Sequence, residues 1–348
     1  MIYKCKMNVI ITGVAGLLGA NFAEYLLSRR AELSLGTIYG VDNLSGGYIE
    51  NLQLDDTSFS FIRGDLTNVE DQKVIERLFK EKSIDYIFHF SAYAAEGLSP
   101  FIRQFNYISN IIPTTFLINM GIKYNIKRFV FTSSMATYGR NDTPFTEDMK
   151  PNPIDPYGIA KYACEMDLQV AYEQHGMEYC VILPHNVYGK YQNIWDPYRN
   201  VLGIWMYKAT KGDPFTVYGD GEQTRAFSYI DDILPCLWKA AVSDRAKNER
   251  INLGGKYGVS LNVAAALVSK VTGKNDIIHL EPRHEVKHAW SSYEKSEEIL
   301  GYKENTTLER GLELMWEWVK TQPIRDPVYW KDYELEKNIY SYWKVRNS

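Results

Sequence analysis

Two kinds of hydrophobic pattern alternate along the first half of the chain. Short apolar runs rich in Val, Ile, Phe and Tyr predict buried strands at residues 8–12, 37–42, 58–62, 86–90, 128–132 and 179–183. Between them, apolar positions recur at helical spacing and predict helices at residues 20–30, 69–80, 107–124 and 157–175. This strand–helix alternation predicts an α/β fold, a doubly wound parallel sheet with helices on both faces.

The pattern changes from about Pro184, where Gly- and Pro-punctuated loops dominate up to Asp220. Helical spacing returns at residues 232–241, 261–272 and 308–321. We therefore expect a first domain of residues 1–183, with 228–252 crossing back to it, and a smaller C-terminal lobe of residues 184–227 and 253–348.

Composition narrows the classes of protein that remain. A net charge of −4 gives no indication of a nucleic-acid partner. The cysteines are far apart and form no CxxC pair, which predicts neither zinc nor a disulfide framework; they are Cys5, Cys164, Cys180 and Cys236. No signal peptide, membrane span or metal-ligand spacing is recognisable, so we expect a cytoplasmic protein without a metal or a membrane partner.

A glycine-rich turn follows the first predicted strand and opens the first predicted helix. Gly13 permits the tight turn, Gly16 lets a pyrophosphate approach the backbone, and Gly19 lets the helix pack on the strand. Unpaired N–H groups at the start of the helix would bind the phosphates. Asp42 ends the second strand, where a carboxylate binds the ribose hydroxyls and repels a 2′-phosphate, so NAD is favoured over NADP. Asp42 as a simple turn residue is the alternative.

The GxxGxxG spacing resembles the extended short-chain dehydrogenase/reductase superfamily, whose NAD domain has the Rossmann-type fold. The resemblance continues at residues 42–45, 64–66 and 89–92, and at Asn110 in a helix. It implies a set of cofactor-binding residues: Gly13, Gly16, Leu17, Leu18, Asp42, Asn43, Asp65, Leu66, Phe90, Ser91, Ala92, Asn110, Tyr157 and Lys161.

Tyr157 and Lys161 carry the clearest chemical signal, because residues at i and i+4 share one face of a helix. An ammonium group beside a phenol lowers its pKa, so the phenol can take a proton from a sugar hydroxyl. The alternative is that the two residues are an ordinary pair on the surface of a helix. The resemblance implies a third catalytic residue, Ser134, at the end of the preceding strand, with Ser133 as the nearby alternative.

The residues after Ser134 narrow the reaction. In the family that this chain resembles, the dehydratases have Asp-Glu at this place, the decarboxylating members have Glu, and the 3,5-epimerising members have Cys. This chain has Met135 and Ala136 there, and neither side chain can move a proton. The resemblance to sugar-nucleotide epimerases therefore implies C4 epimerisation of a nucleoside-diphosphate sugar through a 4-keto intermediate. An NAD-dependent 4-dehydrogenase or 4-ketoreductase would use the same residues. A catalytically silent NAD-binding regulatory protein is the alternative of another class.

The second half carries the implied substrate contacts. The resemblance assigns them to Ser133, Asn186, Tyr218, Arg225 and Arg283. Two guanidinium groups suit a diphosphate, because each can bind its oxygens bidentately. The chain departs from the family pattern at Leu183 and Ala226, which puts the phosphate role on the remaining basic residues. His185 could be read as a base, but we expect a structural or substrate-contact role. The resemblance also implies a homodimer formed through the helices predicted at 107–124 and 157–175.

Overall fold

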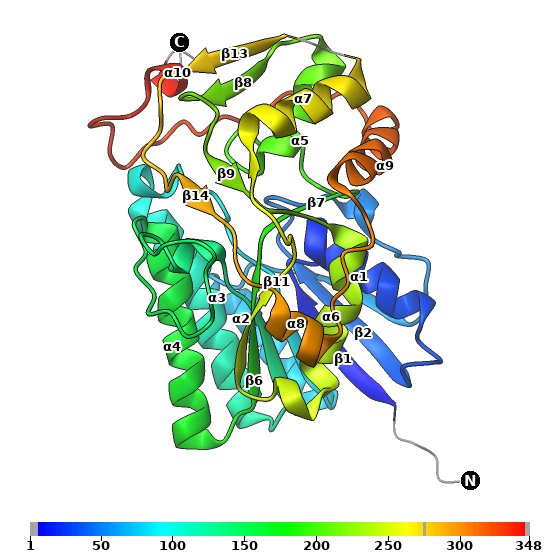
Figure 1. The fold of residues 1–348 in the computed structure, drawn as a ribbon. Helices are drawn as coiled ribbons and strands as arrows, with labels where there is room; N and C mark the ends of the chain where they lie inside the picture. Colours follow the sequence, from blue (N-terminus) through cyan, green and yellow to red (C-terminus); the bar gives the residue numbers. More distant parts are fainter. Residues whose placement is uncertain (1–5, 274–275, 345–348) are drawn as a thin grey trace.

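A parallel sheet of seven strands forms the centre of the molecule (Figure 1). The computed structural model describes residues 6–273 and 276–344, so Cys5 and the chain start lie outside the described residues. The strand order is β3-β2-β1-β4-β5-β6-β11. These strands are β1 (Met7–Thr12), β2 (Leu35–Asp42), β3 (Phe59–Arg63), β4 (Tyr86–His89), β5 (Arg128–Thr132), β6 (Tyr179–Pro184) and β11 (Glu249–Leu253). The order reverses between β1 and β4, where such sheets bind ligands at the carboxyl ends of their strands.

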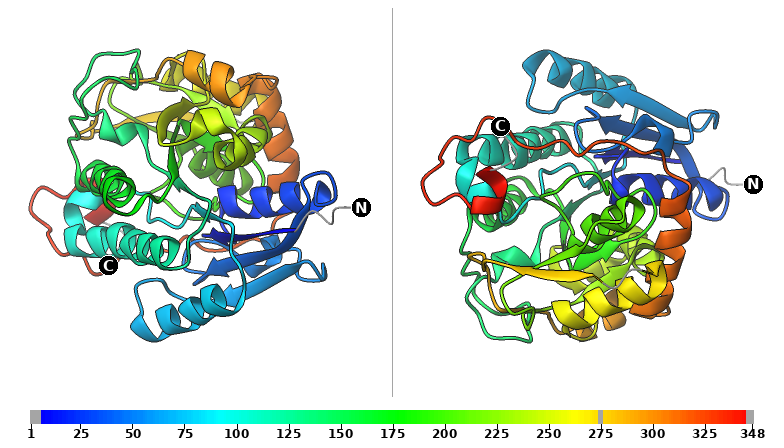
Figure 2. Two further views of the ribbon diagram at one scale, coloured as in Figure 1. Left: turned by 90° about the horizontal axis from the view of Figure 1, so that it is seen from below. Right: turned by 90° about the horizontal axis from the view of Figure 1, so that it is seen from above.

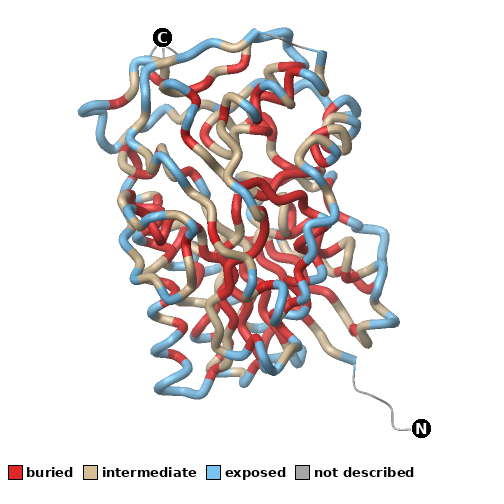
Figure 3. The backbone as a smooth tube through the Cα atoms, viewed as in Figure 1, coloured by how far each residue is buried: buried red, intermediate tan, exposed pale blue. Residues whose placement is uncertain are grey.

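Helices cover both faces of the sheet, as Figure 2 shows from below and above. They are α1 (Leu17–Ser28), α2 (Val69–Glu81), α3 (Arg103–Lys123), α4 (Pro156–His175) and α6 (Ile230–Val242). Alternate strand residues enter two separate cores, because side chains on a strand point to opposite faces. In β1, Val9 and Ile11 pack with α1 and α6, while Ile10 packs with α2, α3 and α4. The buried segments cluster at the sheet (Figure 3). The predicted doubly wound fold is confirmed.

The second lobe is built from shorter elements. Its helices are α5 (Val201–Lys211), α7 (Leu261–Thr272), α8 (Glu294–Leu300), α9 (Leu308–Lys320) and α10 (Ser341–Lys344). Its strands are β7 (Asn186–Tyr188), β8 (Phe215–Tyr218), β9 (Thr224–Arg225), β10 (Phe227–Tyr229), β12 (Val259–Ser260), β13 (Ile277–Leu280) and β14 (His288–Ala289). Short 3₁₀ turns lie at Ile49–Asn51, Ser99–Phe101, Met135–Thr137 and Asp244–Ala246. After α6 the chain returns to the central sheet, where β11 pairs with β6. The limits of the two domains remain a prediction.

The segment after α9 runs back across both lobes and was not interpreted from the sequence (Figure 2, right). The Glu334 carboxylate accepts the backbone N–H groups of Gln104 and Phe105, at 2.7 and 2.8 Å, at the start of α3. Ser341 donates from its backbone and hydroxyl to Glu281 in the second lobe, both at 2.9 Å. Aromatic rings pack between these contacts: Tyr93, Phe101, Tyr198, Trp330, Tyr340 and Trp343. The tail therefore ties the two lobes together.

No helix in residues 6–273 or 276–344 combines the length and apolar character needed to cross a membrane.

Candidate active site

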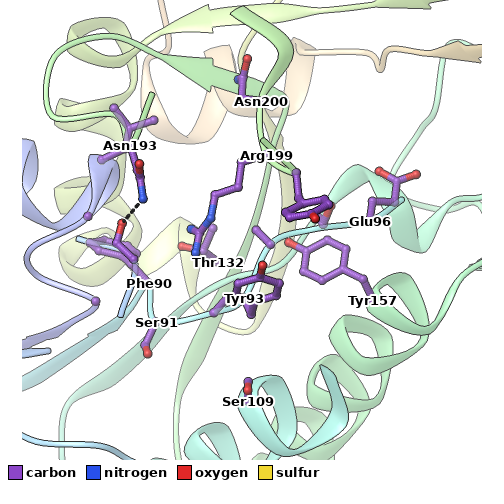
Figure 4. Close-up of a pocket in the computed structure, with 18 of the residues that line it drawn as sticks. Phe90, Ser91, Tyr93, Glu96, Ser109, Thr132, Tyr157, Asn193, Arg199 and Asn200 are labelled. Carbon is purple, nitrogen blue, oxygen red and sulfur yellow. Dashed lines mark hydrogen bonds between the residues drawn. The ribbon is translucent and has the colours of Figure 1, made fainter. Parts of the chain in front are cut away.

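A cavity of about 680 Å³ opens at the carboxyl end of the sheet, next to the point where the strand order reverses. Its walls come from both lobes (Figure 4). In this view Phe90 and Ser91 lie at one end, Tyr157 and Glu96 at the other, and Arg199 between them. The structure brings all the predicted site residues to this cavity, except Asn110.

The glycine turn has a conformation and a packing that admit no side chain. Gly13 has a φ of +68°, and a Cβ on it would lie 2.8 Å from the Ser91 nitrogen. A Cβ on Gly19 would lie 2.2 Å from the Gly13 oxygen. α1 therefore begins directly at the cavity, with Gly16 as an N-cap that places no side chain over the first N–H groups. Such a helix start binds a pyrophosphate.

Asp42 is held in place for a ribose. Its two carboxylate oxygens accept the N–H groups of Ala15 at 2.9 Å and Leu44 at 2.7 Å, and each keeps a further lone pair. Burial raises the pKa of Asp42. Asp65, on the same wall, accepts a hydrogen bond from the Asn43 amide at 3.0 Å. The N–H groups of the glycine turn and the Asp42 carboxylate together suit an adenine dinucleotide.

The predicted catalytic residues meet at the other end of the cavity. Asp155 caps α4 by accepting the Gly158 N–H at 2.9 Å, so Tyr157 stands in the first turn of the helix. The Lys161 Nζ donates to the Thr132 carbonyl at 2.8 Å and lies 5.9 Å from the centre of the Tyr157 ring. Ser134 follows β5 and hydrogen-bonds the phenol of Tyr157.

The expected lowering of the phenol pKa by Lys161 is wrong for the chain by itself. Burial raises the pKa of Tyr157; the hydrogen bond from Ser134 lowers it, and the carboxylates of Glu96 and Asp155 raise it further. Burial also lowers the pKa of Lys161 to about 8. The physical reason is desolvation, which disfavours the charged form of each group and is the largest cause at both.

Ser133 and Ser134 have different surroundings, although they are neighbours. The Ser133 hydroxyl donates to Glu165, which in turn pairs with Arg250 at 2.8 Å. This buried network holds the Ser133 hydroxyl away from the phenol of Tyr157. The geometry therefore supports Ser134 as the hydroxyl beside Tyr157.

Asn110 lies outside the cavity lining, contrary to the expected cofactor contact. Its amide donates to the Asn106 carbonyl at 2.8 Å and to the Tyr93 carbonyl at 3.4 Å. The side-chain amide is therefore hydrogen-bonded to its own helix and to the segment after β4. Asn110 supports the cavity wall at Tyr93 rather than contacting a ligand.

The substrate end contains the predicted arginines. Arg225 pairs with Glu285 at 3.0 Å, and Arg283 stacks on the Tyr218 ring with its Cζ 4.1 Å from the ring centre. The Arg283 Nε has no hydrogen-bond partner among the described residues. Asn186 donates to the Ala226 carbonyl at 3.1 Å. These residues form one wall that could hold a diphosphate.

His185 is better explained as a structural residue than as a base. Its Nε2 lies 2.9 Å from the Ser291 hydroxyl, and burial lowers its pKa to about 3. The imidazole is therefore neutral at physiological pH, which is consistent with a structural or substrate-contact role.

Several wall residues carried no motif and were missed by the sequence analysis. Arg199 pairs with Asp196 at 2.8 Å and reaches across the cavity, where a Cβ on Gly46 would lie 2.6 Å from its Nη2. The Asn193 amide donates to the Gly46 carbonyl at 3.2 Å, which is the dashed line in Figure 4. Both amide atoms of the buried Gln192 lack a partner among the described residues.

The fold and the site define a class of protein: an α/β enzyme with a glycine turn suited to a dinucleotide and with Ser134, Tyr157 and Lys161 together in the same cavity. Within the described ranges, His, Cys, Asp and Glu residues form no group of three or more that could hold a metal ion. Residues 9–254 match the model of the NAD dependent epimerase/dehydratase family, so the chain belongs to that family.

Individual relatives agree with this assignment. A putative UDP-glucose 4-epimerase of Methanocaldococcus jannaschii is 28% identical over 90% of this chain and 98% of its own. The structure of UDP-glucose 4-epimerase from Thermotoga maritima with UDP-glucose has a TM-score of 0.82 and 32% identity, covering 90% of this chain and 99% of that one. UDP-glucuronic acid 4-epimerase from Bacillus cereus, in complex with UDP-glucuronic acid and NAD, has a TM-score of 0.82 and 27% identity, with the same coverage of both chains. The predicted family and the predicted cofactor, NAD, are confirmed.

Proposed function

We propose that this chain epimerises a uridine diphosphate sugar at C4, with NAD as a cofactor that is reduced and reoxidised within one turnover. The observation that carries the proposal is the meeting of Ser134, Tyr157 and Lys161 in the cavity that also contains the glycine turn. The uridine base is supported by the relatives, which act on UDP-sugars. The sequence interpretation left the base open.

In the proposed reaction, bound NAD supplies the hydride acceptor and donor and a positive charge beside Tyr157. The phenol oxygen of Tyr157 takes the proton of the C4 hydroxyl, and Ser134 holds the same sugar oxygen by a hydrogen bond. Lys161, fixed by Thr132, would hydrogen-bond the nicotinamide ribose. The 4-keto sugar would rotate so that hydride can return to the opposite face of C4, and Tyr157 would return the proton to the C4 oxygen.

The decisive experiment incubates the purified chain with UDP-glucose, UDP-galactose and UDP-N-acetylglucosamine and follows the C4 configuration by NMR. We expect interconversion of C4 epimers without net NADH absorbance at 340 nm, because an epimerase returns each hydride it takes. Net NADH formation, or turnover that depends on an outside oxidant, would instead establish the 4-dehydrogenase alternative. Bound NAD without any conversion would support a silent NAD-binding protein.

We also propose that two copies pair through α3 and α4. The two helices pack against each other and expose an apolar face; its residues are Ile108, Ile112, Ile159, Met166 and Val170. Exposed apolar patches of this kind mark protein interfaces. Light scattering should give the mass of a dimer, and V170E should shift it to a monomer. V263E, on an exposed position of α7, is the matched control that should leave the dimer intact. A monomer at every concentration of the unmodified chain would refute the pairing.

We further propose that the protein works in the cytoplasm. The described cysteines, Cys164, Cys180 and Cys236, are buried and unpaired, as expected in a reducing compartment.

A further inference from the structure

Two acids that the proposed reaction does not use stand beside its catalytic tyrosine. Glu96 follows β4 and Asp155 caps α4, and both line the cavity next to Tyr157. Ser99 lies between them: its hydroxyl donates to the backbone carbonyl of Glu96 at 2.8 Å, and its side chain hydrogen-bonds the Asp155 carboxylate. Figure 4 shows Glu96 beside Tyr157 at the same end of the cavity. The acids therefore belong to the place where the reacting sugar carbon must lie.

Asp155 has an unused hydrogen-bonding atom at this wall. The residue is 6% exposed, and its Oδ1 accepts the Gly158 N–H. Its Oδ2 has no partner among the described residues. Glu96 likewise forms no ion pair within residues 6–273 and 276–344. Asp155 and Glu96 therefore line the cavity as two carboxyl groups without an ion-pair partner among the described residues.

The nearby guanidinium groups are paired with other acids, and Arg225 and Arg283 also lower the pKa of Glu96. Glu285 pairs with Arg225 at 3.0 Å and lies 3.7 Å from Arg283. Arg199 pairs with Asp196 at 2.8 Å. Burial and the Glu96 carboxylate together raise the pKa of Asp155 to about 7, and burial raises the pKa of Glu96. A charged Glu96 therefore favours a protonated Asp155, and the pair resists a second negative charge.

Resting on the proposed function, we propose that Glu96 and Asp155 form an acidic wall of the sugar subsite and set its specificity. The wall accepts sugars that present hydroxyl, acetamido or ammonium groups, and it rejects hexuronates, whose carboxylate at C6 carries a like charge.

Rotation of the 4-keto sugar brings its C6 substituent to the acidic wall whichever way the substrate first binds. When the ring turns to present its other face, its C3 and C5 edges exchange places. The C6 substituent is attached at C5, so it faces the acidic wall in one of the two poses. Two like charges about 6 Å apart, at an effective dielectric constant of about 20, cost a hexuronate roughly 100-fold in kcat/KM.

The test compares kcat/KM for UDP-glucose and UDP-glucuronate by NMR. The unmodified chain should prefer UDP-glucose by roughly 100-fold, and E96Q should reduce that preference at least tenfold, mainly through a lower KM for UDP-glucuronate. D155N should also reduce the preference. It should leave the start of α4 intact, because Asn is also a good N-cap. E32Q, at an exposed position, is the control for an equal change in net charge and should leave the preference unchanged.

A binding measurement separates this proposal from the proposed function. Calorimetry on Y157F, which should bind but not convert the sugars, should give a weaker affinity for UDP-glucuronate than for UDP-glucose. Equal affinity and equal turnover of the two sugars would overturn the acidic wall and leave the epimerase assignment standing. Failure to convert any UDP-sugar would overturn the proposed function itself, and the wall's role with it.

Discussion

Replacing Tyr157 by Phe is expected to lower kcat by roughly 10³-fold while NAD stays bound. The substitution removes the phenol oxygen that exchanges a proton with the sugar, and it keeps the ring in its buried place. Ser134 and Lys161 remain, but a hydroxyl and an ammonium held by a backbone carbonyl cannot replace the missing proton acceptor. The rate is measured by NMR with UDP-galactose, and NAD content by absorbance after denaturation.

Y172F is the matched control for this substitution. Tyr172 lies on the same helix, α4, and is exposed, so the same loss of one oxygen should leave kcat within about twofold. A Y157F chain that retains its turnover within about threefold would remove Tyr157 from the mechanism.

Replacing Gly19 by Ala should weaken NAD binding at least ~100-fold and destabilise the chain by about 1–3 kcal/mol. The added Cβ would lie 2.2 Å from the Gly13 oxygen and 2.5 Å from the Val14 Cα. These are backbone atoms, and the Gly13 N–H donates to the Val41 carbonyl at 2.9 Å, so the turn cannot yield without leaving β2. α1 must then move away from the turn, and its N–H groups no longer converge on a pyrophosphate. Calorimetric titration with NAD and thermal unfolding measure the two effects.

Gly176 offers the control, because a substituent there meets no atom within 4 Å although its φ is +71°. G176A should therefore cost about 1 kcal/mol of backbone strain and leave NAD affinity unchanged. If G19A bound NAD as tightly as the unmodified chain, the close approach of α1 to the turn would not be what forms the cofactor site.

Features that depend on neighbours in the chain could be predicted from the sequence. The strands β1 to β6 and the helices between them follow from apolar periodicity, and the structure contains them at nearly the predicted residues, whereas β11 was not predicted as a strand. The turn at Gly13 and the i, i+4 spacing of Tyr157 and Lys161 are equally local. Their physical meaning is set by one strand–turn–helix unit or by one face of one helix.

Features that depend on packing between distant segments could not be predicted in this way. α3 begins at Arg103 rather than near residue 107, because Glu334 from the tail accepts the N–H groups of its first turn. Arg199 and Glu96 reach the cavity from segments that carry no motif.

The direction of the pKa shift at Tyr157 also depends on the tertiary surroundings rather than on local spacing. Sequence spacing places an ammonium beside the phenol, but the surrounding protein decides how much water both groups lose. The sequence by itself determined which groups could do the chemistry, since their residue types and spacing are local. The tertiary structure decided which hydroxyl and which acids face the substrate and how each group is charged, because burial and contacts between remote segments exist only in the folded chain.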